Sequence, residues 1–258
     1  MKIQYVSQIF NAAQRLPFSA LIKPAAPVLI LAGNCVQPWS EGGRAFMKAA
    51  ALSFEKVFVV PGPAEYASNP EACYKQNMTQ LYNIVYKNNN TYMLDNRTFD
   101  IDPSRTIAGT TLWNHLVGTR HPIADLTGIN ARYEGPTKAL QFAQIQKRAV
   151  QDMHLEGRQY LRAAALNPEN CTQKLVFATY HVPTFELLTD EDKADYNTAV
   201  MANNELFYCE DPLHLWIAGA GAGAAQVRYK GVYMVKNAYG FDEIAAPSFS
   251  KEAVVELA

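Results

Sequence analysis

Short runs of β-branched and aromatic residues, each followed by turn-forming residues, determine the architecture expected of this chain. Three of them open the sequence: Ile3–Val6, Pro27–Leu31 and Lys56–Val60. Such runs are typical of buried strands with loops at their carboxyl ends. Between the second and third runs, Phe46, Ala50 and Phe54 recur at helical spacing within Glu41–Phe54. This alternation of strand and helix predicts an α/β protein whose sheet has both faces covered.

The rest of the chain continues the pattern. Further strands are predicted at Tyr92–Leu94, Thr98–Ile101, Thr106–Gly109, Leu175–Ala178, Leu213–Ala218 and Gly231–Val235. Helices are predicted at Glu71–Lys87, Lys138–Ala165 and around Thr189–Asn203, the second with a kink at Gly157. The three closely spaced runs between residues 92 and 109 predict a meander. No linker, repeat or block of like charges divides the chain, so we predict a single domain over residues 1–258.

Composition excludes some classes of partner. The 258 residues include 23 Lys and Arg against 24 Asp and Glu, and a net charge of -1 gives no basic field for nucleic acid or an anionic membrane surface. The four cysteines show no CxxC pairing and are expected to be free, mostly packed thiols. The first residues lack a basic region followed by an apolar stretch, and no apolar run could span a bilayer. We therefore expect a cytoplasmic protein without nucleic-acid or membrane partners.

Five segments at the ends of predicted strands carry the clearest family signal. They are Ser7–Phe10, Ala32–Asn34, Pro61–Glu65, Thr179–Pro183 and Trp216–Ala222. In order and spacing they resemble the D-x-H, G-D, G-N-H-E, T-H-H-x-P and W-x-H-G-H-x-H blocks of the calcineurin-like metallophosphoesterases. Supporting similarities lie at Leu94–Arg97, Gly109–Trp113 and Lys236–Gly240. The resemblance covers nearly the whole chain and implies a sandwich of two packed mixed β-sheets flanked by helices.

The chemistry of that family, as the resemblance implies it, needs two metal ions about 3.5–4 Å apart that bridge the substrate phosphate and activate a hydroxide. Such ions bind carboxylate oxygens and imidazole nitrogens. At the positions that the resemblance assigns to the metal ligands and the general acid, this chain has none of these groups. We call these positions the vestigial site: Gln8, Phe10, Asn34, Pro63, Ala64, Tyr180, Ala220 and Ala222.

The residues that differ from the family pattern are mainly those of the metal site, whereas residues that shape the loops match it. Asn34 stands at the position of the bridging ligand and Ala64 at that of the general acid, while Gly33, Gly62 and Glu65, which shape the loops, are present. Unpaired acidic and imidazole groups would be costly in a site without metal, so neutral fillers are expected there. The resemblance therefore indicates a degenerate member with no metal, no cofactor and no catalytic residue, with Phe10 as a plug for the cavity.

Three functional hypotheses follow. The first is a pseudoenzyme with a binding, scaffolding or assembly role, its partner a protein or a second copy of the chain. The second is a metal-independent binder of a nucleotide or another small polar molecule, held by Gln8, Asn34, Tyr180 and His181. The third is a phosphoric ester hydrolase with residual activity or with chemistry relocated to groups brought together from loops: His115, His121, Asp125 and His181.

Each candidate residue also has a structural interpretation. Gln8 and Asn34 are amides of the kind that hydrogen-bond the backbone of turns. His181 is interpreted as a hydrogen-bonded, partly buried histidine rather than a catalytic one. The run Gly219-x-Gly221-x-x-Ala224 matches a dinucleotide fingerprint in letters, but that motif must open a helix. Here Gln226–Tyr229 and Gly231–Val235 predict two strands of a hairpin, so we reject the dinucleotide interpretation.

Overall fold

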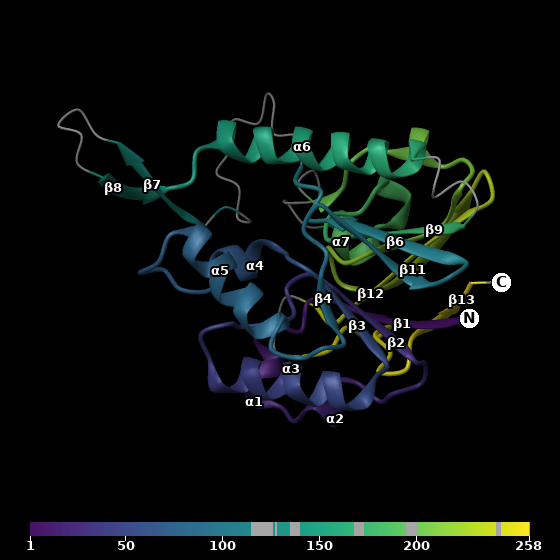
Figure 1. The fold of residues 1–258 in the computed structure, drawn as a ribbon, viewed down its shortest axis with the longest axis horizontal. Coiled ribbons are helices and arrows are strands. Elements are labelled where there is room, and N and C mark those ends of the chain that lie inside the picture. Colours follow the sequence, from purple (N-terminus) through teal and green to yellow (C-terminus); the bar gives the residue numbers. More distant parts are fainter. Residues whose placement is uncertain are drawn as a thin grey trace.

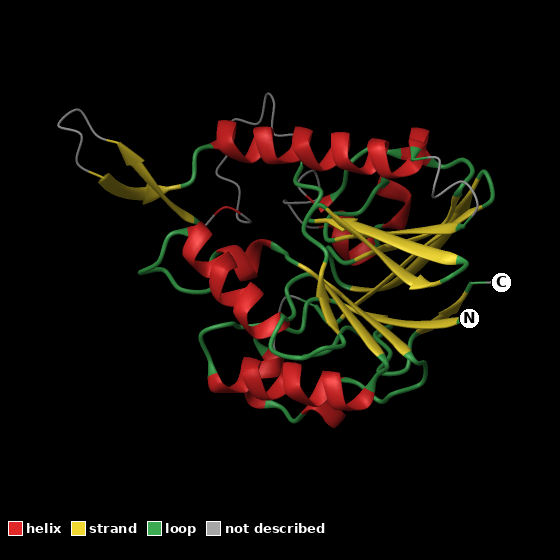
Figure 2. Cartoon of the chain, in the orientation of Figure 1, coloured by secondary structure: helices red, strands yellow, loops and turns green. Residues whose placement is uncertain are grey.

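Two mixed β-sheets face each other at the centre of the molecule (Figures 1 and 2). The computed structural model describes residues 1–114, 126, 128–134, 140–167, 173–194, 201–240 and 244–257. The first sheet has the order β13-β1-β2-β3-β4, with β1 (Lys2–Val6), β2 (Val28–Ala32), β3 (Lys56–Val60), β4 (Thr91–Met93) and β13 (Val254–Glu256). The second has the order β11-β12-β10-β9-β6-β5, with β5 (Arg97–Asp102), β6 (Arg105–Thr110), β9 (Lys174–Thr179), β10 (Leu213–Ala218), β11 (Gly223–Tyr229) and β12 (Val232–Ala238). This is the predicted sandwich.

Alternation along the central strands divides the core in two. In β2, Ile30 faces the second sheet, while its neighbours Leu29 and Leu31 face the helices outside the first sheet. Strand β3 repeats the pattern in parallel register, with Ile30 paired to Phe58. Both faces of these strands are therefore apolar, which explains their continuous hydrophobic runs.

Helices cover the outer face of each sheet (Figure 1). On the first sheet lie α1 (Ala12–Arg15), α2 (Phe18–Leu21), α3 (Glu41–Ser53), α4 (Pro63–Tyr66) and α5 (Tyr74–Val85). The second sheet is covered by α6 (Lys147–Leu166), with α7 (Asp190–Ala194) and the short 3-10 turns η3 (Phe185–Leu187) and η4 (Leu206–Tyr208) nearby. None of the helices within the described ranges is both long and apolar enough to cross a membrane.

The predicted meander is wrong in one strand. β5 and β6 form an antiparallel hairpin in the second sheet, but β4 pairs in parallel with β3 in the first. The residues between β4 and β5 therefore carry the chain from one sheet to the other. Local spacing could not distinguish these arrangements, because both join short strands through tight connections.

The long predicted helix begins later than expected and has no break. Residues 140–144 form β8 (Leu140–Gln144), which pairs with β7 (Asn130–Glu134) in a separate ribbon, and α6 starts at Lys147. The helix continues through Gly157, where a kink was predicted. A β-carbon on Gly157 would lie 3.0 Å from the Thr110 hydroxyl oxygen. The glycine thus serves close packing of α6 on β6, at a cost of about 1 kcal/mol in helix propensity.

The loop after β10 leads into a hairpin, as predicted. β11 and β12 pair in antiparallel fashion from Gly223 with Ala238 to Tyr229 with Val232. No helix opens after Gly219, so the dinucleotide interpretation stays rejected. In the predicted helical insert around residues 189–203, α7 accounts for residues 190–194, and residues 195–200 lie outside the described ranges.

Candidate functional site

The loops that follow β1, β2, β3, β9 and β10 meet at the carboxyl edges of the two sheets. The Ser7 hydroxyl donates to the Gly219 carbonyl at 2.8 Å, and the Gly219 amide donates to the Tyr180 carbonyl at 2.9 Å. The Phe10 amide donates to the Asn34 carbonyl at 2.8 Å. The segments identified from sequence motifs are therefore contiguous in space, although they span more than 200 positions of the chain.

At the centre of this edge, three neutral side chains bind one another. Asn34 Nδ2 donates to Gln8 Oε1 at 2.8 Å and to the Tyr180 hydroxyl at 2.9 Å. Gln8 Nε2 also donates to the Tyr180 hydroxyl at 3.2 Å, and Asn34 Oδ1 accepts from the Ala64 amide at 2.8 Å. Each polar atom of the Asn34 side chain is thus engaged by the protein itself. Gln8 and Tyr180 are buried and Asn34 is half-buried.

The backbone around these residues keeps a specialised shape. Gln8 has a φ of 58° and Asn34 a φ of 53°, both in the left-handed region. Asparagine tolerates this region well, whereas glutamine enters it at a cost. Such strain persists only where the surrounding structure imposes it, and it concentrates at functional sites. The surrounding loops therefore hold Gln8 and Asn34 in a backbone shape that these residues would rarely adopt by themselves.

The Tyr180 ring fills the space beside two glycines. A β-carbon on Gly62 would lie 2.9 Å from Tyr180 Cδ2, and one on Gly33 would collide with the same ring. The side chain is 1% exposed. A phenol ring, longer than the imidazole that the resemblance places here, thus occupies the interior of the site.

The Glu65 side chain links the loop after β2 to the loop after β3. Its Oε1 accepts from the amides of Cys35 at 2.6 Å and Val36 at 2.9 Å. Its Oε2 accepts from the amides of Asn34 at 2.9 Å and Gly62 at 2.8 Å. Burial raises the pKa of Glu65 to about 7, although the backbone donors oppose that rise. This carboxylate is structural, since it is 0% exposed and saturated by the backbone.

A buried ion pair supports the glycine and alanine loop after β10. The Lys236 ammonium on β12 binds the Asp192 carboxylate on α7, and both side chains have no exposed surface. Lys236 also donates to the Ala222 carbonyl at 3.1 Å, and the Ala222 amide donates to Asp192 Oδ1 at 2.6 Å. Sequence reasoning missed this pair. The signal was a lysine within the apolar run of β12, a position where an unpaired charge would be costly.

The remaining positions of the vestigial site play smaller parts. Phe10 is half-buried and follows Ile9 out of the core, so its proposed role as a plug stays a prediction. Pro63 is buried at the first position of α4, which suits its fixed φ, and Ala64 follows it half-buried. Ala220 is buried beside the Tyr180 carbonyl, to which its amide donates at 2.7 Å.

His181 is a packed histidine. It is 1% exposed, its Nδ1 lies 3.2 Å from the Thr111 carbonyl oxygen, and its ring packs edge-on against Tyr180 with centroids 4.7 Å apart. The other groups of the relocated-chemistry hypothesis, His115, His121 and Asp125, lie outside the described residues. Across the part of the chain that is described, no group of three or more His, Cys, Asp or Glu side chains could hold a metal ion.

The side chains present do not fit a dinuclear metal centre. Two amides, a phenol, a phenyl ring, a proline and methyl groups stand where two dications would need anionic oxygens and imidazoles. The amide groups already bind each other and the phenol, and the charged groups nearest the last loop, Lys236 and Asp192, neutralise one another. We therefore derive no catalytic step through metal at this edge.

Solved structures with a similar fold support the architecture described above. No protein-family model matches the chain. The uncharacterized protein L509 of Acanthamoeba polyphaga mimivirus is 21% identical over 224 residues, which make up 83% of this chain and 78% of that protein. Among solved structures, the phosphopantetheinyl hydrolase PptH from Mycobacterium tuberculosis matches with a TM-score of 0.63 and 15% identity, over 93% of this chain and 89% of that one.

A second solved structure, TT1561 of Thermus thermophilus, matches with a TM-score of 0.55 and 13% identity, over 93% of this chain and 88% of that one. At such identities the likeness shows the fold alone. The chain therefore has the calcineurin-like metallophosphoesterase fold, as the sequence motifs predicted.

Proposed function

We propose that this protein is a metallophosphoesterase-like pseudoenzyme: it keeps the fold, does not assemble the two-metal centre, and acts by binding rather than by hydrolysis. The hydrogen-bonded set of Gln8, Asn34 and Tyr180 is the observation that carries the proposal. These three positions would have to supply metal ligands, and their polar atoms instead satisfy one another in a buried site. A dication entering there would have to break these bonds and would gain only neutral donors.

The pattern of replacement supports the same conclusion. Residues that shape the loops are present and used: Glu65 collects four backbone amides, and Gly33 and Gly62 make room for Tyr180. The departures from the family pattern that the resemblance assigns fall mainly on the positions of the metal ligands and the general acid. Loss of selection on the whole fold would have damaged both sets, whereas selection for a stable binding protein explains the difference.

The direct test measures metal and turnover together. Purified protein is incubated with excess Mn²⁺, dialysed and analysed for metal, and bis(p-nitrophenyl) phosphate hydrolysis is followed with Mn²⁺ and with a chelator. We expect well under one manganese per chain and no turnover that the chelator abolishes. Two bound manganese ions per chain, or chelator-sensitive turnover, would contradict the proposal.

A reversal variant provides the matched control. It combines the seven substitutions toward the family pattern: Gln8→Asp, Phe10→His, Asn34→Asp, Pro63→Asn, Tyr180→His, Ala220→His and Ala222→His. Its circular dichroism must match that of the parent before metal is measured. We expect more bound manganese in this variant than in the parent, which would show that the assay detects metal on this fold.

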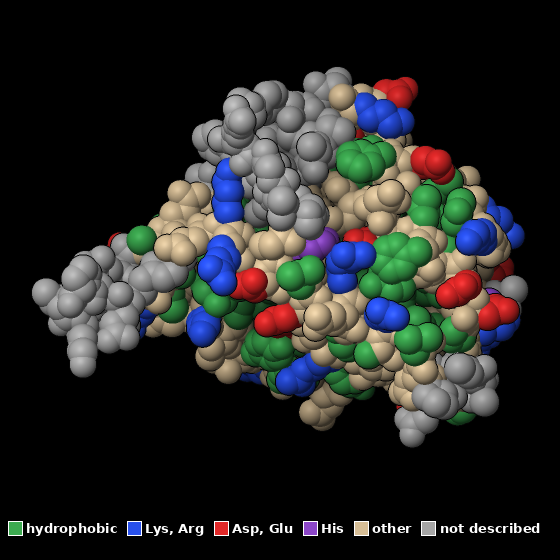
Figure 3. All heavy atoms as spheres, turned by 90° about the horizontal axis from the view of Figure 1, so that it is seen from above, with side chains coloured by type: hydrophobic (Ala, Val, Ile, Leu, Met, Phe, Trp, Pro, Cys, Tyr) green, Lys and Arg blue, Asp and Glu red, His purple; other side chains and the backbone are tan. Residues whose placement is uncertain are grey.

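The binding role is proposed to involve a protein partner or a second copy of the chain. Exposed apolar side chains support this idea: Leu155 and Leu166 on α6 and Phe207 on η4 are 42%, 66% and 51% exposed and line one hollow. Positive and negative side chains are interspersed on the face that carries α6 (Figure 3). Light scattering during size-exclusion chromatography tests for self-association, and Leu166→Asp should weaken it; a monomeric parent would leave a different protein as the partner.

A further inference from the structure

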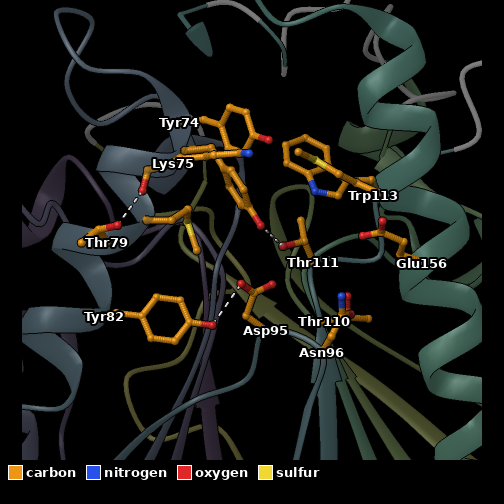
Figure 4. Close-up of a pocket in the computed structure, with 13 residues that line it drawn as sticks. Tyr74, Lys75, Thr79, Tyr82, Asp95, Asn96, Thr110, Thr111, Trp113 and Glu156 are labelled. Atoms are coloured by element: carbon orange, nitrogen blue, oxygen red, sulfur yellow. Dashed lines mark hydrogen bonds between the residues drawn. The ribbon is translucent and has the colours of Figure 1, made fainter. Parts of the chain in front are cut away.

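A hollow different from the one lined by Leu155, Leu166 and Phe207 lies beside the vestigial site. It was not predicted from the sequence. It encloses about 300 Å³ between α5 and α6, at the carboxyl ends of β4 and β6 (Figure 4). Thr111 lies between the two places: its hydroxyl lies 3.4 Å from the Tyr66 hydroxyl in the hollow, and its carbonyl oxygen lies 3.2 Å from Nδ1 of His181, whose ring packs against Tyr180 of the vestigial site. We call this hollow the α5/α6 pocket.

Aromatic rings form much of its wall. Tyr66 and Trp113 meet edge to face with centroids 5.0 Å apart, and Tyr74 and Tyr82 face the pocket from α5. Two of these rings already have a cation at one face: Lys75 Nζ lies 6.0 Å from the centroid of Tyr74, and the Arg97 guanidinium carbon lies 5.6 Å from that of Tyr82. Tyrosine faces attract cations through the negative potential of the ring.

Two carboxylates point into the same space. Asp95, after β4, accepts a hydrogen bond from the Tyr82 hydroxyl at 3.2 Å, and Glu156 projects from α6 on the opposite side (Figure 4). Burial raises the pKa of Asp95, the hydrogen bond from Tyr82 and the charge of Arg97 lower it, and the negative charge of Glu156 adds a smaller rise. Among the described residues neither carboxylate forms an ion pair. Within the described part of the chain, the half-buried Asp95 thus has no directly bound counter-ion, and the exposed Glu156 adds a second negative charge on the other side of the hollow.

We propose that the α5/α6 pocket binds a small organic cation, with its protonated amine between Asp95 and Glu156 and its apolar part against the tyrosine and tryptophan rings. The volume suits a molecule with about ten non-hydrogen atoms. Within the lining, two carboxylates face the single ammonium of Lys75 at the exposed edge, and the Arg97 guanidinium lies outside the lining against Tyr82, so an anion entering the pocket would meet both acids. This inference does not depend on whether the vestigial site is inactive.

The probe is 2-phenylethylammonium, and 2-phenylethanol is its neutral counterpart of nearly the same shape. Trp113 is 4% exposed and lines the pocket, so its fluorescence should report binding in a titration, with calorimetry as the second measurement. We expect the ammonium compound to bind at least tenfold more tightly than the alcohol. Phenylalanine carries the same ammonium group and an added carboxylate, which Lys75 could bind. We expect it to bind less tightly than 2-phenylethylammonium if the ligand is a simple amine, and more tightly if the ligand is an amino acid.

Charge-removing variants of nearly unchanged shape complete the test. Asp95→Asn should weaken 2-phenylethylammonium binding by tenfold or more, and Asp95→Asn with Glu156→Gln should abolish it. Asp152→Asn is the matched control, because Asp152 is an exposed acid on α6 that does not line the pocket. The proposal fails if the parent does not bind the amine at millimolar concentration, if the alcohol or inorganic phosphate binds as well, or if the control variant loses as much affinity as the double variant.

Discussion

The vestigial site and the α5/α6 pocket lie on opposite sides of Thr111, and they differ in how they satisfy their polar groups. In the vestigial site, amides and a phenol bind one another, the Glu65 carboxylate beside them is saturated by backbone amides, and Lys236 pairs with Asp192 behind the last loop. In the pocket, Asp95 and Glu156 lack an ion-pair partner among the described residues. The first region satisfies its polar groups internally, whereas the second presents two acids that no described cation binds directly.

This difference separates stability from binding. Substitutions in the vestigial site should lower the free energy of unfolding and leave the affinity of the pocket unchanged. Substitutions of the pocket acids should do the opposite. The following experiments test that separation, and any result that mixes the two effects would show that the regions act as one.

The largest loss of stability is expected from Lys236→Met. It leaves the Asp192 carboxylate buried without its counter-ion, and breaking such a pair costs about 3–5 kcal/mol. Urea unfolding followed by circular dichroism measures the change. Lys236→Met combined with Asp192→Asn should recover a large part of it, because no buried charge is then left. A single variant as stable as the parent would mean that the pair contributes nothing to the folded state.

Glu65 should give the next largest effect, and it depends on pH. Because its folded pKa of about 7 lies above the ordinary value of 4.5, the folded state holds the proton more tightly and loses stability as the pH rises from 4.5 through 7. The expected loss is about 3 kcal/mol at about 1.4 kcal/mol per pKa unit. Urea unfolding at pH 4.5, 6 and 7.5 should show that loss in the parent relative to Glu65→Gln, which cannot titrate. Parallel pH profiles in the two proteins would refute it.

Tyr180→Phe should have a smaller effect. It removes the oxygen that accepts from Gln8 and Asn34 and leaves the ring in place, so the expected cost is about 1–2 kcal/mol in urea unfolding. Affinity for 2-phenylethylammonium should not change. A fall in that affinity would show that the wall at Thr111 transmits changes from one region to the other.

The smallest effect on stability is expected from Asp95→Asn. The amide that this substitution introduces can still accept from Tyr82, and loss of the charge removes the repulsion from Glu156, so the free energy of unfolding should stay within about 1 kcal/mol of the parent. The same urea titration measures it. A much larger loss would make Asp95 a structural residue and remove the contrast with the vestigial site.

Sequence patterns predicted the sandwich because its central strands are apolar on both faces and its loops carry a recognisable order of motifs. They also placed Gln8, Asn34 and Tyr180 at one edge. They could not assign β4 to a sheet, since pairing with β3 is a long-range choice that a three-residue strand does not encode locally. They predicted a kink at Gly157, because a packing contact with Thr110 cannot be recognised from the sequence of the helix itself.

The pocket and the buried ion pair were missed for a related reason. Asp95 and Glu156 are 61 positions apart in the numbering and meet only because α6 lies on β6. Lys236 and Asp192 are likewise 44 positions apart, with all of β10 and β11 between them. Such pairs can be seen only once the two sheets and their helices are placed together.

Gly157 also affects the width of the α5/α6 pocket. Its neighbour Glu156 and its contact Thr110 both belong to the lining, so the distance from helix to sheet at this point fixes how wide the hollow is. A methyl group at residue 157 would push α6 away from β6, widen the pocket and weaken the ligand binding that we propose there. The size of ligand that the pocket accepts would then depend on the absence of a β-carbon at residue 157.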